Sequence, residues 1–217
     1  MNALRGGSLG LWLALYLGVL VWSGIGPKDR ITWVLEVAPA VIGLVVLAAT
    51  RRRYPLTPLA YLLVLVHAVI LMVGGHYTYA EVPLFDRLAE LFGHARNNYD
   101  KLGHFAQGFV PAVLAREILL RTGAVHGRGW LNYAVVTTCL ALSAAYELIE
   151  WLVALLSDEA AEAFLGTQGY VWDTQSDMAM ALLGALLALA LLGRRHDRQL
   201  ATFGWPGATM DAARTTD

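Results

Sequence analysis

The sequence predicts an all-α protein, a polytopic membrane bundle of about six transmembrane helices with one short interfacial helix. Of the 217 residues, 57% are hydrophobic and 15% are charged, and the mean hydropathy is +0.52. A soluble fold of this size does not bury so much apolar surface. The apolar residues also fall into six runs, most of them near the 20 residues that a helix needs to cross a bilayer.

The first three runs cover residues 9–21, 31–49 and 59–75. A short positive end with Arg5 precedes the first run, and Ser23-Gly24-Ile25-Gly26 is a poor cleavage site, so we expect an uncleaved first span rather than a signal peptide. The second run contains Glu36 and ends at three arginines, residues 51–53, and the third has His67 in its middle.

Residues 84–92 predict a short amphipathic helix that ends at Gly93. Phe85, Leu88 and Phe92 share one face, and charged residues occupy the other. The segment is too short and too charged to cross a bilayer. We therefore expect it to lie on the membrane surface.

The last three spans are expected at residues 100–121, 130–156 and 173–193. The loop 157–172 between the last two holds three acids and no base. We expect residues 1–200 to form a single transmembrane domain and residues 201–217 to be a disordered cytoplasmic tail.

Most of the sixteen lysines and arginines fall on the side of the bundle that holds both termini. By the positive-inside rule, this predicts a multi-pass protein of the bacterial inner membrane with both termini in the cytoplasm. The net charge of −1 gives no reason to expect a nucleic-acid partner. The single cysteine, Cys139, excludes an internal disulfide and a cysteine-based metal site. The oligomeric state is not indicated.

Ionisable residues gather at those helix ends that face one side of the membrane, the outer side if the termini are cytoplasmic. The ionisable residues are His76, Asp100, His104, Glu147, Glu150, Asp173 and Asp177, with the polar Gln107 beside them, and on the same assumption Glu36 joins them. A charged group at the bilayer centre costs roughly 2.5 to 3.5 kcal/mol. We therefore expect these side chains to meet in a shared polar pocket.

The mixture of imidazole and carboxylates suits Mn, Mg or Zn, and it could also act without metal as an acid–base pair. We predict His104, Glu147 and Asp177 as catalytic residues and as metal ligands. Binding residues for the substrate are expected at Gln107, Asp100, Glu150 and Asp173.

Each residue also has a structural interpretation. Asp100 and Asp173 are placed as N-caps, and His104 could be a packing histidine hydrogen-bonded to Glu147. For His67 and Glu36 we favour a structural role. Ion pairing at i, i+4 spacing is expected among Arg116, Glu117 and Arg121.

Three functions remain open from the residues. The first is a membrane-embedded site, metal-assisted or acid–base, that acts on or binds a lipid-linked or other envelope substrate from the outer leaflet. The second is a small proton-coupled transporter. The third is a non-catalytic scaffold in which the polar groups only fix helix packing.

Several motifs in fixed order resemble the bacterial YjdF-type inner membrane proteins, a family without an assigned biochemical function. They are residues 77–83 (YTYAEVP), 99–109 (YDKLGHFAQGF), 146–151 (YELIEW), 166–169 (GTQG) and 172–178 (WDTQSDM). A fainter resemblance runs to VanZ-like proteins, through Asp100-Lys101-x-x-His104, Tyr146-Glu147 and Asp177 with Gly184, although Ala181 stands where that pattern has Asn. The VanZ-like resemblance implies an envelope-related role and no mechanism.

Overall fold

The computed structural model describes residues 7–156 and 167–202, and within those ranges the chain is helical, with no strand. The elements in chain order are α1 (Gly7–Gly24), α2 (Arg30–Thr50), α3 (Pro58–Tyr77), the 3-10 turn η1 (Tyr79–Glu81), α4 (Pro83–Phe92), α5 (Tyr99–Thr122), α6 (Arg128–Leu156) and α8 (Asp173–Ala201). The helical membrane bundle predicted from the sequence is confirmed. The three acids of the loop 157–172, and the tail from residue 203, lie outside the described residues.

Five of the described helices are long and apolar enough to cross a membrane, namely α1, α2, α3, α6 and α8. The sixth long helix, α5, has 24 residues and therefore sufficient length. It is less apolar because it carries Asp100, Lys101, Arg116, Glu117 and Arg121. Several of its charged side chains are buried against neighbouring helices, so α5 is the helix on which the polar interior is built.

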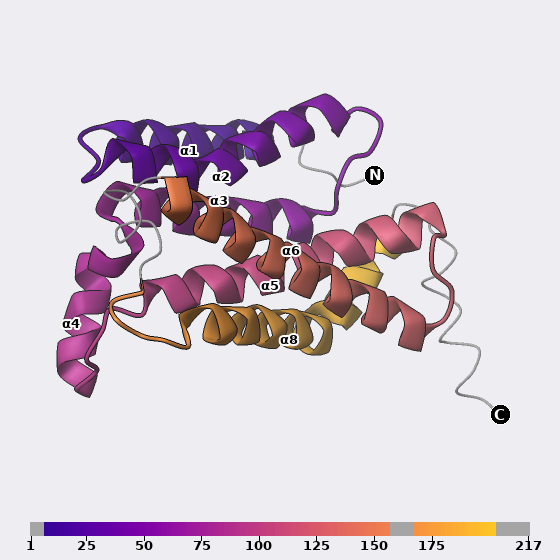
Figure 1. Cartoon of the computed structure of the whole chain (residues 1–217). Coiled ribbons are helices and arrows are strands. Elements are labelled where there is room, and N and C mark those ends of the chain that lie inside the picture. Colours follow the sequence, from indigo (N-terminus) through magenta and orange to yellow (C-terminus); the bar gives the residue numbers. More distant parts are fainter. Residues whose placement is uncertain (1–6, 157–166, 203–217) are drawn as a thin grey trace.

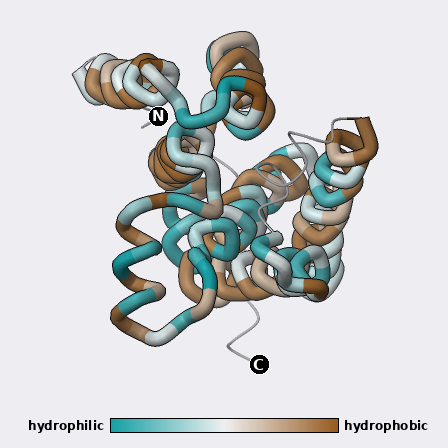
Figure 2. Tube along the Cα trace, turned by 60° about the vertical axis from the view of Figure 1, so that its left-hand side comes forward, coloured by the Kyte–Doolittle hydropathy of each residue, from teal (hydrophilic) through white to brown (hydrophobic). Residues whose placement is uncertain are grey.

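The long helices run side by side, and α4 stands across one end of the bundle (Figure 1). The described chain begins in α1 and finishes in α8 at the opposite end, on the right in Figure 1, so both described ends of the chain share one side. Helix α5 packs most extensively against α8 and also contacts α3 and α6. Figure 2 brings the α4 end forward and shows hydrophilic stretches gathered there, while the peripheral helices are mostly apolar.

Small residues let α5 and α8 approach each other closely. A Cβ on Gly108 would collide with the backbone carbonyl of Ala181, and one on Gly184 would lie 2.8 Å from the amide nitrogen of Phe109. Close backbone contact at glycine is a common way for membrane helices to associate, because lipid provides no hydrophobic drive between them. This contact sets the distance between the polar side chains that α5 and α8 carry.

The short helix α4 lies within one residue of the predicted bounds. It begins one residue earlier than expected, at Pro83, and Gly93 ends it in the left-handed conformation with φ 67°. No residue of α4 is buried, in keeping with a surface position. Asn97, just beyond it, donates a hydrogen bond of 2.7 Å to Asp86, which ties α4 to the start of α5.

The expectation that Asp100 and Asp173 are N-caps is wrong. Helix α5 begins at Tyr99 and α8 at Asp173 itself, so both acids lie inside the first turn of their helices. At α5 the side chain of Asn97 accepts a hydrogen bond from the Tyr99 amide at 3.0 Å and begins the helix earlier. Both carboxylates are thereby released to face other side chains.

Candidate functional site

Five ionisable side chains from three helices converge at the α4 end of the bundle. We call Asp100 and His104 of α5, Glu147 and Glu150 of α6 and Asp177 of α8 the His104 cluster. All five are buried, with exposed fractions between 2% and 9%. The predicted convergence is therefore present in the structure, where it brings acids from separate helices to a single histidine.

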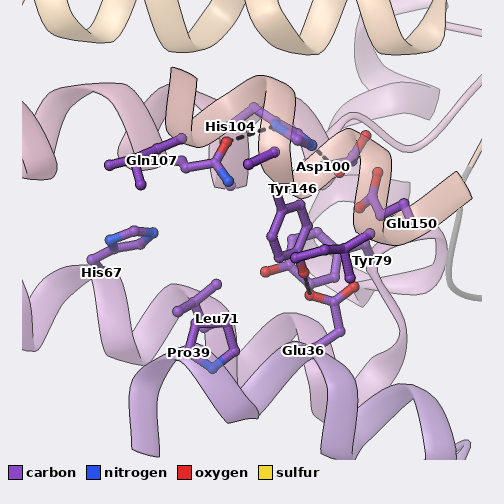
Figure 3. A pocket seen from close by; sticks show the side chains of 14 residues that line it. Glu36, Pro39, His67, Leu71, Tyr79, Asp100, His104, Gln107, Tyr146 and Glu150 are labelled. Carbon is purple, nitrogen blue, oxygen red and sulfur yellow. Dashed lines mark hydrogen bonds and ion pairs between the residues drawn. The ribbon is translucent and has the colours of Figure 1, made fainter. Parts of the chain in front are cut away.

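His104 is central because its ring touches both halves of the cluster. Its Nδ1 lies 3.1 Å from Oε1 of Gln107, an atom that can only accept, so Nδ1 carries the proton and donates. Its Nε2 faces Asp100 Oδ1 at 3.4 Å and Glu147 Oε1 at 3.7 Å. Figure 3 shows His104 and Gln107 extending from α5 over the same space.

Ligand atoms in the cluster form two overlapping triads. Atoms of Asp100, His104 and Asp177 lie within 4.8 Å of one another, and so do atoms of His104, Glu147 and Glu150. The predicted metal ligands His104, Glu147 and Asp177 are thus divided between the two triads, with His104 common to both. Glu150, which the sequence suggested only for substrate binding, stands beside Glu147 in the second triad.

Glu147 has a feature that a purely structural carboxylate does not share. Its Oε1 is buried and has no hydrogen-bond partner in the described chain. A buried carboxylate oxygen without a partner costs several kcal/mol relative to its hydrated state. The structural interpretation, in which His104 and Glu147 are simply hydrogen-bonded to each other, is contradicted by the 3.7 Å separation.

Lys101 neutralises the other side of the cluster, a role that the sequence analysis missed. Its Nζ lies 2.7 Å from Asp173 Oδ1 and 2.6 Å from Asp177 Oδ1. Arg96 also binds Asp173, at 2.7 Å. Because Lys101 follows Asp100 directly, a helical projection places it on a neighbouring face, and only the closeness of α8 brings its ammonium to Asp177.

A cavity of about 290 Å³ adjoins the His104 cluster, enclosed by α2, α3, η1, α5 and α6 (Figure 3). Its lining residues are Glu36, Pro39, His67, Leu71, Tyr79, Asp100, Gly103, His104, Gln107, Leu142, Ala145, Tyr146, Ile149 and Glu150. The predicted binding residues Gln107, Asp100 and Glu150 all line it. Asp173 does not, because Arg96 and Lys101 hold it toward the loop side.

Glu36 belongs to this cavity, although we favoured a structural role for it from the sequence. It is 3% exposed, and its Oε2 accepts a hydrogen bond of 3.0 Å from the hydroxyl of Tyr146. Helix α2 therefore contributes a third acid-bearing wall to the cavity, beside α5 and α6. Tyr146 also packs edge-on against His104, with the ring centroids 6.2 Å apart, so this tyrosine links Glu36 to the His104 cluster.

Tyr79 closes one end of the cavity by fitting against two glycines. Its ring occupies the space that a side chain at Gly74 or Gly103 would need, the latter Cβ lying 2.7 Å from the ring. Burial raises the pKa of the Tyr79 hydroxyl well above its usual range, so it remains a proton-bearing donor. His76, by contrast, is directed away from the cavity, where its Nδ1 lies 3.1 Å from the carbonyl of Ser23.

A second polar cluster lies at the other end of α5, about 20 Å from His104 along the helix. We call Thr57, Arg116, Glu117, Arg121 and His196 the Glu117 cluster. The predicted i, i+4 ion pair is confirmed, with Arg121 2.7 Å from Glu117. Arg116 instead reaches across to α8, where it donates to Nδ1 of His196 and to Asp197.

Both carboxylate oxygens of Glu117 accept hydrogen bonds. Its two oxygens accept from the amide and hydroxyl of Thr57, from Arg121 and from Nε2 of His196 at 3.1 Å. Because Arg116 can only donate to Nδ1, the proton of His196 must be on Nε2, as the bond to Glu117 requires. The Glu117 cluster caps the start of α3 and fixes it to α5 and α8, which is a structural function.

Fold and site together define a helical membrane protein with a buried histidine–carboxylate site beside a cavity. The comparisons with known proteins then identify the family. The chain matches the family described as "Predicted membrane protein (DUF2238)" over residues 9–198, and it belongs to that family. It is 55% identical to "Inner membrane protein YjdF" of Escherichia coli (strain K12) over 186 residues, which cover 86% of this chain and 89% of that protein.

The YjdF resemblance drawn from the motifs is therefore confirmed, and the VanZ-like resemblance is not shown by these comparisons. No solved structure matches the chain. The relative's printed name supports a protein of the inner membrane.

Proposed function

We propose that the His104 cluster is a membrane-embedded site in which His104, Glu147 and Glu150 hold a divalent cation, Mn, Mg or Zn, and act on or bind a lipid-linked or other envelope substrate. Gln107 would orient the ring of His104 through Nδ1, Asp100 would lie beside the ion, and Lys101 would hold Asp177 as a supporting carboxylate. With both termini in the cytoplasm, the cavity would open toward the outer leaflet.

One observation carries this proposal: the lone pair of His104 Nε2 points toward two carboxylates. With the ring proton on Nδ1, a neutral imidazole would set that lone pair against negatively charged oxygens at 3.4 and 3.7 Å. Such an arrangement is repulsive unless a positive charge lies between them. A metal ion, a second ring proton or a proton on one of the carboxylates would remove this repulsion.

The spacing favours a metal ion over the proton. Charge-assisted hydrogen bonds to an imidazolium have donor–acceptor distances of about 2.7 to 2.9 Å, shorter than both separations. Ligands about 2.1 Å from a shared tetrahedral ion lie about 3.4 Å apart, close to the observed values. The unpartnered Oε1 of Glu147 gives that ion a further ligand.

The bound ion would polarise a substrate oxygen or lower the pKa of a bound water. If no metal binds, His104 and Glu147 can still exchange a proton as an acid–base pair. The proton-coupled transporter is less well supported, because the residues of α5 that are buried between the two clusters, such as Ala106, Val110 and Val113, are apolar.

Elemental analysis of purified protein tests the metal. The wild type should contain one of the three metals, and His104→Ala should lose it. His94→Ala is the matched control, because His94 is exposed beyond α4 and outside the cluster. Equal metal content in wild type and His104→Ala would overturn the metal part of the proposal.

A further inference from the structure

The cavity beside His104 is not closed on the side that faces lipid. Four of its lining residues are themselves exposed: Pro39 of α2, and Leu142, Ala145 and Ile149 of α6. Leu142 and Ile149 have exposed fractions of 47% and 50%. Both helices are apolar and long enough to cross a membrane, so the exposed rim of the cavity is a bilayer-facing surface.

Helix packing explains why this rim is open. Helix α2 packs against α3, whereas α6 packs against α5 and α8, and no extensive contact joins α2 to α6 in the described chain. Pro39 lies about 14 Å into α2, and Leu142 lies about 21 Å from either end of α6. The rim therefore sits at the depth of the hydrocarbon, where a water-filled entrance would be costly.

The polar floor of the cavity lies nearer the membrane surface than the rim. Glu36 is about 9 Å from the start of α2, and Glu150 is about 9 Å from the end of α6. A molecule that spans floor and rim must be polar at one end and apolar at the other. The cavity thus has the polarity gradient of a membrane amphiphile.

The charges of the lining restrict the head group. Three carboxylates, Glu36, Asp100 and Glu150, line the cavity, while no lysine or arginine is among the described lining residues. An anionic head such as a phosphate would meet like charge at Glu36, which belongs to neither triad. An amine or a hydroxyl would instead donate hydrogen bonds to the carboxylates.

We infer that the cavity takes a membrane amphiphile that enters sideways from the bilayer between α2 and α6, with an amine or hydroxyl head at Glu36, the lining carboxylate that belongs to neither triad, and its hydrocarbon chain along Leu142, Ala145 and Ile149. This inference names the substrate class of the proposed His104 site and rests on that proposal. Figure 3 shows Glu36 and Glu150 on facing walls of the space.

Cysteine labelling in nanodiscs tests the route. In a Cys139→Ala background, Ala145→Cys should react with a bilayer-soluble maleimide and resist a charged, membrane-impermeant methanethiosulfonate. Leu148→Cys is the lipid-facing control, since it is 62% exposed on α6 and outside the cavity lining. Glu90→Cys, on the exposed face of α4, is the water-facing control.

If Ala145→Cys reacts with the charged reagent as fast as Glu90→Cys, the cavity opens to water and the sideways route is wrong. If it behaves like Leu148→Cys, the route is supported. A cationic reagent makes the comparison stringent, because the acidic lining would attract it into any aqueous entrance.

The head group is tested on the same variant with three probes of equal chain length, dodecylamine, dodecanol and dodecyl phosphate. The amine and the alcohol should slow maleimide labelling of Ala145→Cys several-fold and leave Leu148→Cys unchanged. Protection by the phosphate alone, or by none of the three, would overturn the inference. Labelling requires no metal. A negative labelling result would therefore overturn the amphiphile inference alone, whereas a negative elemental analysis would overturn the metal site.

Discussion

Each of the two polar clusters of α5 contains a buried histidine and a buried glutamate, and the clusters differ in how completely the atoms of these residues are paired. In the Glu117 cluster, the glutamate and the histidine have a partner for every polar side-chain atom. In the His104 cluster, the histidine faces Glu147 at 3.7 Å, beyond hydrogen-bond distance, and Oε1 of that glutamate has no hydrogen-bond partner in the described chain. Burial of charge is therefore common to both clusters, and the pairing of their atoms is what distinguishes them.

The same two helices supply both clusters. Helix α5 contributes His104 and Glu117, and α8 contributes Asp177 and His196. At the Glu117 end His196 joins α8 to Arg116 and Glu117 of α5, and at the His104 end Lys101 of α5 joins Asp177 of α8. Variants that act on one cluster and spare the other test this difference.

Glu117→Gln should have the largest effect. It removes a buried charge that pairs with Arg121 and turns an acceptor into a donor facing His196 or Arg121, which costs about 3 to 5 kcal/mol. Glu147→Gln, measured without metal, should leave the thermal midpoint unchanged or raised, because Oε1 has no hydrogen bond to lose.

Thermal unfolding in detergent with a chelator present measures both variants. If Glu147→Gln lowered the thermal midpoint as much as Glu117→Gln, the two clusters would be equivalent. That result would favour a non-catalytic scaffold over a functional site at His104.

Gly108→Ala should displace both clusters together, because its new methyl group collides with the carbonyl of Ala181 in the α5–α8 contact. We expect a loss of about 1 to 3 kcal/mol, the usual cost of overpacking. Gly43→Ala is the matched control, since nothing lies within 4 Å of its added Cβ and alanine is the better helix former. Equal melting of the two variants would contradict close helix contact at Gly108.

Asp177→Asn should lower the free energy of unfolding by only about 1 kcal/mol, because Lys101 keeps Asp173 and exchanges one charged acceptor for a neutral one. The metal content of the same variant also distinguishes the two triads. Metal content should fall in Glu150→Gln and persist in Asp177→Asn. The opposite result would place the ion among Asp100, His104 and Asp177.

Sequence patterns located the helices and their polar ends because both follow from local physics. Hydropathy fixes which segments can lie in lipid, and the alternation of spans fixes which ends share a side, so the meeting of His104 with Glu147 and Asp177 could be expected before any coordinates. Gly93, after α4, likewise predicts the end of that helix from local sequence alone, because glycine readily adopts the left-handed conformation.

Pairing between helices was decided by the tertiary structure alone. Lys101 reaches Asp177 because Gly108 and Gly184 let two helices touch, and Glu36 enters the cavity because α2 packs on α3. Which buried group finds a partner depends on distances of a few tenths of an ångström between segments far apart in the chain. Local sequence carries no record of those distances, and so only the packed structure distinguished the fully paired Glu117 from the incompletely paired Glu147.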